Sequence, residues 1–371
     1  MRLRYHDPID GEPSFTGRIS QLSWTRGQQG PVESYTYAYD RAGRLTEAVR
    51  TSNSFETIER MTLKGSYAPY SETGITYDRN GNMLSLSRIG RSGADSFIMG
   101  YEGNQLRFVS RNGTALGNCY HDPNGNMSYA PHMGMSFSFN GRNYIEKVYT
   151  NGSTLVNYSY LADGSKLSAT DGEGDGLLYR GSLIYRKTGD DIELESAAFS
   201  EGRFVRSAGG IIRPMIHITD HLGSVRAVVD GLTGQTVETN DYYPFGSRWE
   251  DEDGISDLTN RYRFNGKEDQ EGEFGVPTLD YGARHYTTSS ARWLSMDPLS
   301  EKYYGISPYA FCNNDPVNFV DLDGRRWINS LGQVVYDKNG ISSYASPQEK
   351  LLIETMAKTR TGQEQLKKNS Q

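Results

Sequence analysis

Hydrophobic and polar positions alternate one by one in several stretches of the first half of the chain. In residues 34–39 (SYTYAY) every second residue is a tyrosine, and residues 157–160 (NYSY) repeat the pattern. Alternation with a period of two is typical of a β-strand that buries one face and leaves the other in solvent. The pattern therefore predicts strands whose tyrosine rings lie on one face of a sheet.

A short turn motif separates these strands and recurs along the chain. It reads YDRAGRL at residues 39–45 and YDRNGNM at 77–83, with variants at 120–127 and 160–167. Glycine adopts the positive φ that tight hairpin turns need, so we expect Gly43, Gly81, Gly125 and Gly164 at turns. One hairpin cannot bury its tyrosine face alone, so neighbouring hairpins must stack. Residues 34–170 are therefore predicted to form antiparallel hairpins.

Residues 292–324 (RWLSMDPLSEKYYGISPYAFCNNDPVNFVDLDG) have a different pattern, in which turn formers alternate with aromatic side chains. Two Asp-Pro pairs, one Ser-Pro pair and one Asp-Gly pair interrupt the segment. Proline restricts its own φ and biases the preceding residue towards an extended conformation. The pattern predicts a compact plug that brings Asp297 and Asp321 near each other. Residues 281–286 (YGARHY) read as one strand that leads into this plug, in which Tyr281 and Arg284 are expected to pack rather than catalyse.

The pattern changes again after Gly324. Residues 332–344 alternate and contain YDKNG at 336–340, which predicts a last hairpin. Residues 346–349 (SPQE) form a capping box with proline at the first helical position, and the apolar residues that follow give the predicted helix a buried face. Residues 361–364 (TGQE) resemble the start of a second helix. The sequence thus predicts a short α-helical stub at the C-terminus.

Composition narrows the class of protein. The 371 residues include 26 tyrosines and 41 glycines, which suits many short strands joined by tight turns. The net charge of −7 gives no electrostatic indication of nucleic-acid binding by this chain. No long apolar run predicts a membrane segment, and the N-terminus lacks the apolar core of a signal peptide. Cys119 and Cys312 are too few for a disulfide framework, so we expect two buried thiols.

Residues 292–324 resemble the core signature of RHS-repeat (YD-repeat) proteins. The blocks HITDHLGSVRAVVD, YYPFGS and YRFNGKE further upstream resemble the other core blocks of that family, in the same order. The resemblance implies an all-β fold: a YD-repeat hairpin spiral, forming part of a shell, closed by an RHS core plug. It divides the chain into YD/RHS repeats at 1–205, an RHS repeat-associated core at 206–324 and a variable C-terminal segment at 325–371, the start of an incomplete toxin or cargo domain.

The resemblance also implies a function. Polymorphic-toxin proteins of this type, used in bacterial competition, form a β shell that encapsulates and delivers a C-terminal toxin. The implied partners are the chain's own C-terminal cargo, an immunity protein and a secretion apparatus. The chain would be a fragment of a longer secreted or cell-surface protein, without a signal peptide in this fragment. Two alternatives stay open: a cis-acting aspartyl autoprotease, and a secreted or cell-surface β scaffold that binds carbohydrate through its tyrosine-rich face.

Asp297 and Asp321 are the candidate catalytic residues of such an autoprotease. Their resemblance to the aspartates of self-cleaving RHS cores implies a cut just after Gly324, most simply between Arg325 and Arg326. Two neighbouring carboxyl groups that share a proton can act as base and acid on one water molecule. The sequence departs from the family pattern at Leu322, Arg325 and Met296, so we expect slow cleavage or none. The alternative is that both aspartates only form turns.

No cofactor or metal site is predicted. His217 and His221 have the spacing of a zinc-binding helix, but Ile218 stands where the glutamate of that motif would be. The surrounding Ile and Val residues favour a strand, in which residues four apart lie about 13 Å from each other. No serine or cysteine lies in a recognisable nucleophile motif. The glycine-rich residues 171–176 and the acidic residues 250–254 are expected to be loops.

Overall fold

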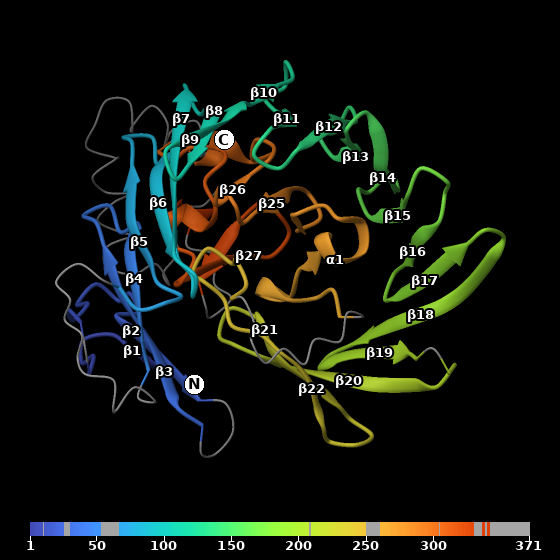
Figure 1. Ribbon diagram of the computed structural model, residues 1–371, viewed down its shortest axis with the longest axis horizontal. Helices are drawn as coiled ribbons and strands as arrows, with labels where there is room; N and C mark the ends of the chain where they lie inside the picture. The colour runs from blue at the N-terminus through green and yellow to red at the C-terminus, as the bar shows by residue number, and fades with distance from the viewer. Residues whose placement is uncertain are drawn as a thin grey trace.

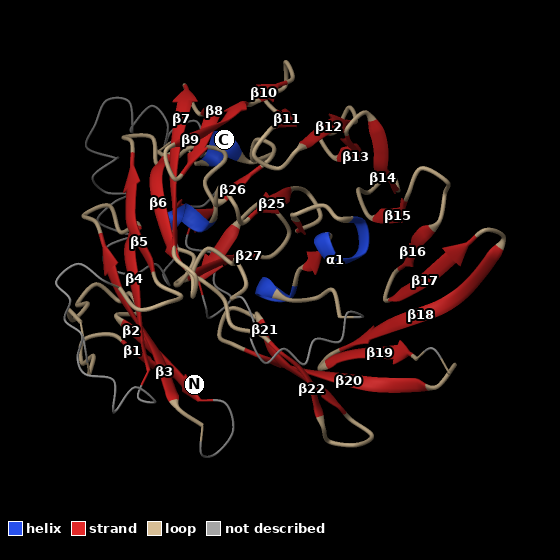
Figure 2. Cartoon of the chain, in the orientation of Figure 1, coloured by secondary structure: helices blue, strands red, loops and turns tan. Residues whose placement is uncertain are grey.

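The computed structural model describes residues 1–9, 11–25, 30–52, 67–207, 209–249, 260–303 and 305–329, and the backbone of 336–337 and 340–341. Strands dominate this part of the chain, and they follow one another in an arc around a central segment (Figures 1 and 2). The predicted all-β fold is confirmed. The acidic residues 250–254 and the predicted C-terminal helices lie outside the described residues.

Two large antiparallel sheets form the arc, and within each sheet every strand pairs with the next one in the sequence. The first sheet contains, among the described residues, β1 (Arg2–Arg4), β2 (Gln21–Thr25), β3 (Val32–Tyr39), β4 (Leu45–Ser52), β5 (Glu72–Tyr77), β6 (Met83–Ile89), β7 (Ala94–Glu102), β8 (Gln105–Arg111) and β9 (Thr114–Asn118). The second contains β10 (Tyr120–His121), β11 (Met127–Ala130), β12 (Met135–Phe139), β13 (Ile145–Thr150), β14 (Ser153–Tyr160), β15 (Lys166–Thr170), β16 (Gly176–Arg180), β17 (Leu183–Thr188), β18 (Asp191–Phe199), β19 (Gly202–Arg206), β20 (Ile212–Thr219), β21 (Val225–Asp230) and β22 (Thr236–Thr239).

The repeat motif forms the predicted turns. Gly43, Gly81, Gly125 and Gly164 all lie between paired strands with φ between 80° and 91°. At the first of these turns the Oδ1 atom of Asp40 accepts hydrogen bonds from the backbone N–H groups two and four residues later, both at 2.9 Å. The aspartates of the next two units do the same. The aspartate of the motif therefore closes the turn, and the glycine supplies its positive φ.

The tyrosine of the motif links several units to an earlier one, whereas Tyr120 of the third motif is exposed. The hydroxyl of Tyr77 donates to the carbonyl of Leu45 at 2.7 Å, and that of Tyr101 donates to the carbonyl of Met83 at 2.7 Å. Tyr160 makes the same bond to Ile145 at 2.8 Å. In each case the acceptor is the first residue of a strand that follows an earlier turn. A tyrosine ring on the inner face thus finds both an apolar contact and a hydrogen-bond acceptor.

The central segment is built from very short elements. Its strands and helix, as far as the structure describes them, are β23 (Glu268–Asp269), α1 (Glu271–Phe274), β24 (Leu279–Asp280), β25 (His285–Thr287), β26 (Arg292–Trp293), β27 (Phe319–Asp321) and β28 (Trp327–Asn329), with 3₁₀ turns at Phe264–Gly266, Ser300–Lys302 and Cys312–Asn314. Beyond it, β29 (Tyr336–Asp337) pairs with β30 (Gly340–Ile341), which confirms the predicted last hairpin. The predicted plug at residues 292–324 is one part of this central segment, and from here on we use the name plug for residues 260–329.

Two sequence predictions need correction. Residues 281–286 do not form one strand, because a turn at residues 281–284 separates β24 from β25. Buried Arg284 lies in this turn and makes hydrogen bonds that a straight strand would not allow. The sequence also favours a strand over residues 235–243, but they contain only β22, since the chain leaves the sheet after Thr239. The strand order also runs without a break through residue 205, so the division of the chain there stays a prediction.

Hydrogen bonds from plug side chains to backbone carbonyls attach the plug to the repeat turns of both sheets. The side-chain amide of Asn314 donates to the carbonyl of Gly81 at 2.7 Å, and the hydroxyl of Tyr309 donates to the carbonyl of Gly125 at 2.6 Å. Asp315 is fully buried and lies 3.1 Å from the Nε atom of Arg18. The same turns that connect the strands therefore also provide acceptors for the plug.

A buried ion cluster attaches the plug to the second sheet. The Nζ atom of Lys166, on β15, lies 2.5 Å from Glu268 and 2.7 Å from Asp280, both in the plug. The hydroxyl of Tyr179, on β16, donates to Glu268 at 2.9 Å. Burial alone would raise the pKa of Asp280, but Lys166, His285 and the backbone N–H of Gly282 together lower it to about 2. The two carboxylates are therefore ionised partners of one ammonium group.

Replacement of Lys166 tests this attachment. Lys166→Met would leave buried Asp280 without its ammonium partner and Glu268 with Arg261, whose Nε atom lies 3.3 Å away, and we expect a loss of about 3–5 kcal/mol in the free energy of unfolding at pH 7. The loss should shrink below about pH 4, because protonation then removes the uncompensated charges in the variant. Urea denaturation of the original chain and of the variant, at pH 7 and again below about pH 4, measures both effects.

Lys187→Met is the matched control. Lys187 lies on β17 and is 3.9 Å from Asp175, and both side chains are about one third exposed. The expected change is within about 0.5 kcal/mol. Equal effects of the two substitutions would contradict a special role for the cluster.

Candidate functional site

Arg284 occupies the centre of the candidate site. The turn between β24 and β25 places it inside the plug, where it is 3% exposed, and its guanidinium group lies 4.1 Å from the centre of the Trp293 ring. Its Nη2 atom lies 2.9 Å from Oδ2 of Asp297 and 3.3 Å from Oδ2 of Asp321. Its Nε atom donates to the carbonyl oxygen of Gly324 at 2.5 Å. One side chain therefore joins both predicted aspartates and the backbone near the predicted cut.

The other oxygen of each aspartate forms a turn. Oδ1 of Asp321 accepts from the backbone N–H groups of the residues two, three and four positions later, at 3.1, 2.7 and 3.2 Å. Oδ1 of Asp297 accepts from the N–H of Leu299 at 2.7 Å. The two interpretations of these aspartates from sequence are thus compatible: each carboxylate uses one oxygen to hold a turn and directs the other towards Arg284.

Burial and charge act on these carboxyl groups in opposite directions. Burial raises the pKa of Asp297 and of Asp321 above the usual value, and Arg284 partly offsets that rise. A single cation between two buried carboxyl groups compensates only one negative charge. The geometry therefore supports a pair in which one carboxyl group holds a proton and the other is ionised.

A small cavity adjoins this pair. Its lining includes Asp297, Asp321 and Arg284 together with Tyr303 and Trp327, and it has room for about one water molecule. Water held there would lie next to a carboxylate that can accept its proton. The arrangement has the parts that hydrolysis of a peptide bond requires: a water site, a base, an acid and a donor to a carbonyl oxygen.

The residues around the predicted cut are held from several sides. Gly324 has φ of 73°, and a Cβ atom there would lie 2.9 Å from the backbone nitrogen of Arg284, so no other residue fits without a shift. The guanidinium of Arg325 is 3.1 Å from the hydroxyl of Tyr144 on the sheet side, and Arg326 is exposed. Leu322 stands where the family has proline, yet its carbonyl accepts from Lys267 at 2.6 Å. The turn is therefore fixed by hydrogen bonds instead of by a proline ring.

The remaining candidates lie elsewhere. His217 is on β20, whereas His221 is in the turn after it and donates from Nε2 to the carbonyl of Val317 at 3.0 Å. Among the residues that the structure describes, no group of three His, Cys, Asp or Glu side chains could hold a metal ion. Cys119 and Cys312 are free and buried, as predicted, and burial raises the pKa of both thiols.

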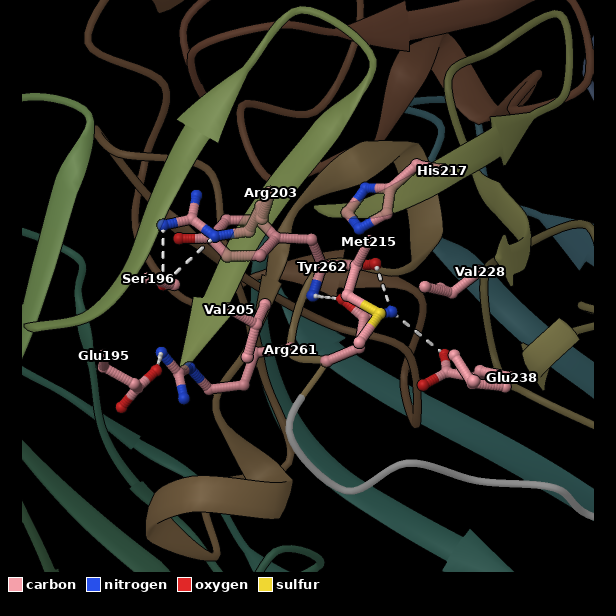
Figure 3. A pocket seen from close by; sticks show the side chains of 12 residues that line it. Glu195, Ser196, Arg203, Val205, Met215, His217, Val228, Glu238, Arg261 and Tyr262 are labelled. Carbon is pink, nitrogen blue, oxygen red and sulfur yellow. Dashed lines mark hydrogen bonds and ion pairs between the residues drawn. The ribbon is translucent and has the colours of Figure 1, made fainter. Parts of the chain in front are cut away.

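A second cavity lies between the inner face of β18–β22 and the start of the plug (Figure 3). Charged side chains line it: Arg261 pairs with Glu195 at 2.6 Å, and Arg203 donates to Ser196 at 2.9 Å. Glu238 is fully buried; one of its oxygens accepts from the side-chain amide of Asn260 at 3.1 Å, and Oε2 has no partner among the described residues. The cavity has room for only about one or two water molecules, so it suits buried water better than a ligand.

Arg284 is the residue that sequence reasoning missed. The sequence predicts only a packing role for it in the YGARHY block, because nothing in a local pattern shows which buried carboxylates an arginine will meet. Two features of the sequence point to such a role for Arg284. It lies in a block that resembles an RHS core block, and a buried arginine needs anionic or carbonyl partners.

Comparison with known proteins gives short or distant matches. The chain is 34% identical over 108 residues to salivary gland surface protein 1 of Aedes aegypti, covering 29% of the chain and 3% of that protein. It is 25% identical over 316 residues to the tRNA nuclease WapA of Bacillus subtilis, covering 84% of the chain and 12% of that protein. It is 33% identical over 106 residues to the toxin subunit YenC1 of Yersinia entomophaga, covering 28% and 10%. The chain thus spans about an eighth or less of these relatives. No protein-family model matches it.

Solved structures share the fold. The crystal structure of TcdB2-TccC3 superposes with a TM-score of 0.55 at 18% identity, covering 85% of this chain and 18% of the other. At this identity the likeness shows the fold alone. Together with the toxin names among the relatives it supports the resemblance to RHS-type proteins, without distinguishing a subtype. None of the helices in the described part of the chain has the length and apolar character needed to cross a bilayer.

Proposed function

We propose that this chain is part of an RHS-type shell that encloses a C-terminal toxin or effector and delivers it. The support is the shared fold with TcdB2-TccC3 and the local similarity to a toxin subunit and a tRNA nuclease. In this proposal the chain belongs to a longer polypeptide that is secreted or displayed at the cell surface. Its partners are its own C-terminal cargo, an immunity protein and a secretion apparatus.

The observation that carries the proposal is the position from which the chain continues past the plug. Strand β27 and strand β28 pair in the plug, and the strands of the two sheets surround this region (Figure 1). Trp327 on β28 packs against the rings of Phe319 and Tyr303, at 4.8 and 5.9 Å between ring centres. The polypeptide that follows therefore starts from a segment anchored inside the arc. A cargo attached there would begin on the inner side of the shell.

The glycan-binding alternative receives no support from the buried repeat tyrosines. The rings of Tyr35, Tyr37 and Tyr158 are buried, and the hydroxyls of Tyr77 and Tyr160 are bonded to neighbouring strands. A carbohydrate platform needs such rings on an outer face. Tyr120 of the third unit differs, because it is exposed and stacks on exposed Tyr129 with 6.0 Å between the ring centres.

Protection of the tail tests the proposed enclosure. If the inner side holds the polypeptide that follows Asn329, trypsin should cleave at Lys350, Lys358 and Lys367 at least about tenfold more slowly in the intact chain than in a free peptide of residues 330–371. Time-resolved mass spectrometry measures both rates under the same conditions. Equal rates would contradict enclosure. The rate of trypsin cleavage after Arg326, whose side chain is exposed, serves as an internal reference for protease access.

Self-cleavage is a second candidate function, favoured by the contacts of Arg284 with both aspartates and with the Gly324 carbonyl. In the reaction, the ionised carboxylate takes a proton from water as the water oxygen attacks a carbonyl carbon. The protonated carboxyl group gives its proton to the leaving nitrogen as the C–N bond breaks. The products are a new carboxyl terminus and a new amino terminus, so atoms and charges balance without a cofactor.

The donor from Arg284 favours one of two neighbouring bonds. Its Nε atom contacts the carbonyl of Gly324, which belongs to the peptide bond between Gly324 and Arg325. A donor aimed at a carbonyl oxygen stabilises the negative charge that develops there during attack. We therefore place the cut at this bond, one residue before the one that the sequence favoured. The intact mass of the released tail distinguishes the two by the mass of one arginine.

The expected result is slow release of a tail fragment of about 5 kDa. Its rate should fall as the pH rises, because the pair must hold one proton, and the raised pKa values of Asp297 and Asp321 extend the range in which it does so to higher pH than for ordinary carboxyl groups. Asp297→Asn and Asp321→Asn should each abolish release. Release that persists in both variants would exclude the pair as the catalyst. Asp171→Asn is the matched control, because Asp171 also holds a turn through its Oδ1 atom but lies outside the plug.

A further inference from the structure

The two large sheets meet at one short segment of the chain. Strand β9 pairs with β8 in the first sheet and β10 pairs with β11 in the second, and only Cys119 separates β9 from β10 (Figure 1). The backbone N–H of Cys119 donates to the carbonyl of Arg107 on β8 at 2.7 Å, and its side chain is fully buried. We call residues 114–132, which contain β9, β10 and β11, the seam. In the described part of the chain, strand pairing does not continue from one sheet to the other here.

Two side chains of the plug span the seam. Arg292 on β26 is 4% exposed, and its Nη2 atom donates at 2.8 Å to the carbonyl of Asn104, in the turn between β7 and β8 of the first sheet. Tyr309 donates to the carbonyl of Gly125, in the turn between β10 and β11 of the second sheet. The guanidinium group of Arg292 lies 4.9 Å from the centre of the Tyr309 ring. This stacked pair therefore joins the two sheets where strand pairing does not.

Arg292 carries a positive charge that no neighbouring carboxylate offsets. Among the described residues it forms no ion pair, and its partners are the Asn104 carbonyl and the rings of Tyr101 and Tyr309, each with its centre 4.9 Å away. Its Nε atom is buried without a hydrogen-bond partner in the same part of the structure. A second positive charge next to this buried cation would therefore be unfavourable.

Two histidines of the seam have buried ring nitrogens without partners. The ring of His121, on β10, lies 6.1 Å from that of Tyr309, and neither of its nitrogens has a hydrogen-bond partner among the described residues. The Nδ1 atom of His132, in the turn after β11, lies 3.7 Å from the Sγ atom of Cys119, and its Nε2 atom also has no described partner. A protonated imidazole has two N–H donors, so both positions suit the neutral ring better.

The surroundings of both rings oppose protonation. Burial, Arg292 and Arg107 together lower the pKa of His121 to about 4, against an opposite effect of Asp122. Burial and then Arg292 lower the pKa of His132 to about 4. A histidine in a hydrated, open chain has a pKa of about 6.5. Protonation therefore favours a state in which these rings have left the seam.

We propose that protonation of His121 and His132 opens the seam in an acidic medium. Above about pH 6.5 both rings are neutral in the closed and in the open state, so the pH does not affect the seam. As the pH falls towards about 4, the open state binds two protons that the closed state does not, and the closed state loses stability. Acid would thus move the rings into solvent and loosen the contact between the two sheets. The device lies in the wall of the shell and requires no self-cleavage.

The two pKa values set the size of the effect. Between about pH 7 and about pH 5, a pKa of about 4 in the closed seam and about 6.5 in the open seam favours opening at least about tenfold for each histidine. The two histidines together should therefore raise the equilibrium constant for opening at least about 100-fold.

The two cysteines of the chain provide the measurement. Cys119 is buried at the centre of the seam, and Cys312 is buried in the plug as an internal reference. Dithiodipyridine labels thiols in acid as well as at neutral pH, and mass spectrometry assigns the label to each cysteine. The labelling rate relative to the urea-unfolded chain at the same pH gives the open fraction. From about pH 7 to about pH 5 this fraction should rise at least about 100-fold at Cys119 and at most about threefold at Cys312.

Removal of the two rings tests their role. The double variant His121→Leu with His132→Leu replaces them by apolar side chains of similar volume, and the acid response of Cys119 should then fall to within about threefold of that of Cys312. Each single substitution should remove about half of the response on a logarithmic scale. Circular dichroism at pH 7 checks that each variant folds, and the single variants decide if the double variant does not.

His217→Leu is the matched control. Burial also lowers the pKa of His217, but this residue lies on β20, outside the seam. The substitution should leave the acid response of Cys119 unchanged, since the seam opens locally. A Cys119 that stays as protected at pH 5 as at pH 7 would overturn the proposal. So would a response that Cys312 shares, that the histidine variants of the seam retain, or that His217→Leu removes equally.

Discussion

The structure depends on one requirement: a tyrosine hydroxyl on the inner face of the sheets must find a hydrogen-bond acceptor where water is excluded. Tyr77, Tyr101 and Tyr160 meet it in the same way, by donating to the carbonyl at the start of a strand in an earlier unit. An unpaired buried hydroxyl would cost free energy, so each unit is stable only when an earlier one is in place. An aspartate follows Tyr39 and Tyr77 and closes the turn there, and the two side chains together explain why the Tyr-Asp motif recurs.

The plug depends on the same turns. Asn314 and Tyr309 bond to the carbonyls of the turn glycines Gly81 and Gly125, one in each sheet, and Lys166 holds plug carboxylates against the second sheet. Within the plug, Arg284 joins Asp297, Asp321 and the backbone at Gly324. The segment that precedes the tail is therefore anchored to both sheets. Enclosure and release of a tail, as proposed, would act through this one anchored segment.

Much of this fold could be predicted because its signals are local. Alternating tyrosines and positive-φ glycines such as Gly43 and Gly81 define hairpins within a few residues, and the structure has those hairpins. The plug was recognisable as irregular, and Asp297 and Asp321 could be named from motif resemblance. The partner of these aspartates could not, because Arg284 meets them only through tertiary folding. The inward side of β16 was also hidden, since Leu177 and Leu178 are both apolar and alternation cannot say that Leu177 is the one that joins the core.

Native-state hydrogen exchange of the full chain tests the central claim that plug and sheets stabilise one another. Four buried amides report the opening free energy of each region: those of Trp293 and Asn314 in the plug, and those of Leu86 and Val148 in the two sheets. If the plug and the sheets form one cooperative unit, all four amides should exchange with the same opening free energy, within about 1 kcal/mol, and the same denaturant dependence. Plug amides that exchange through a much lower opening free energy while the sheets stay protected would contradict the account.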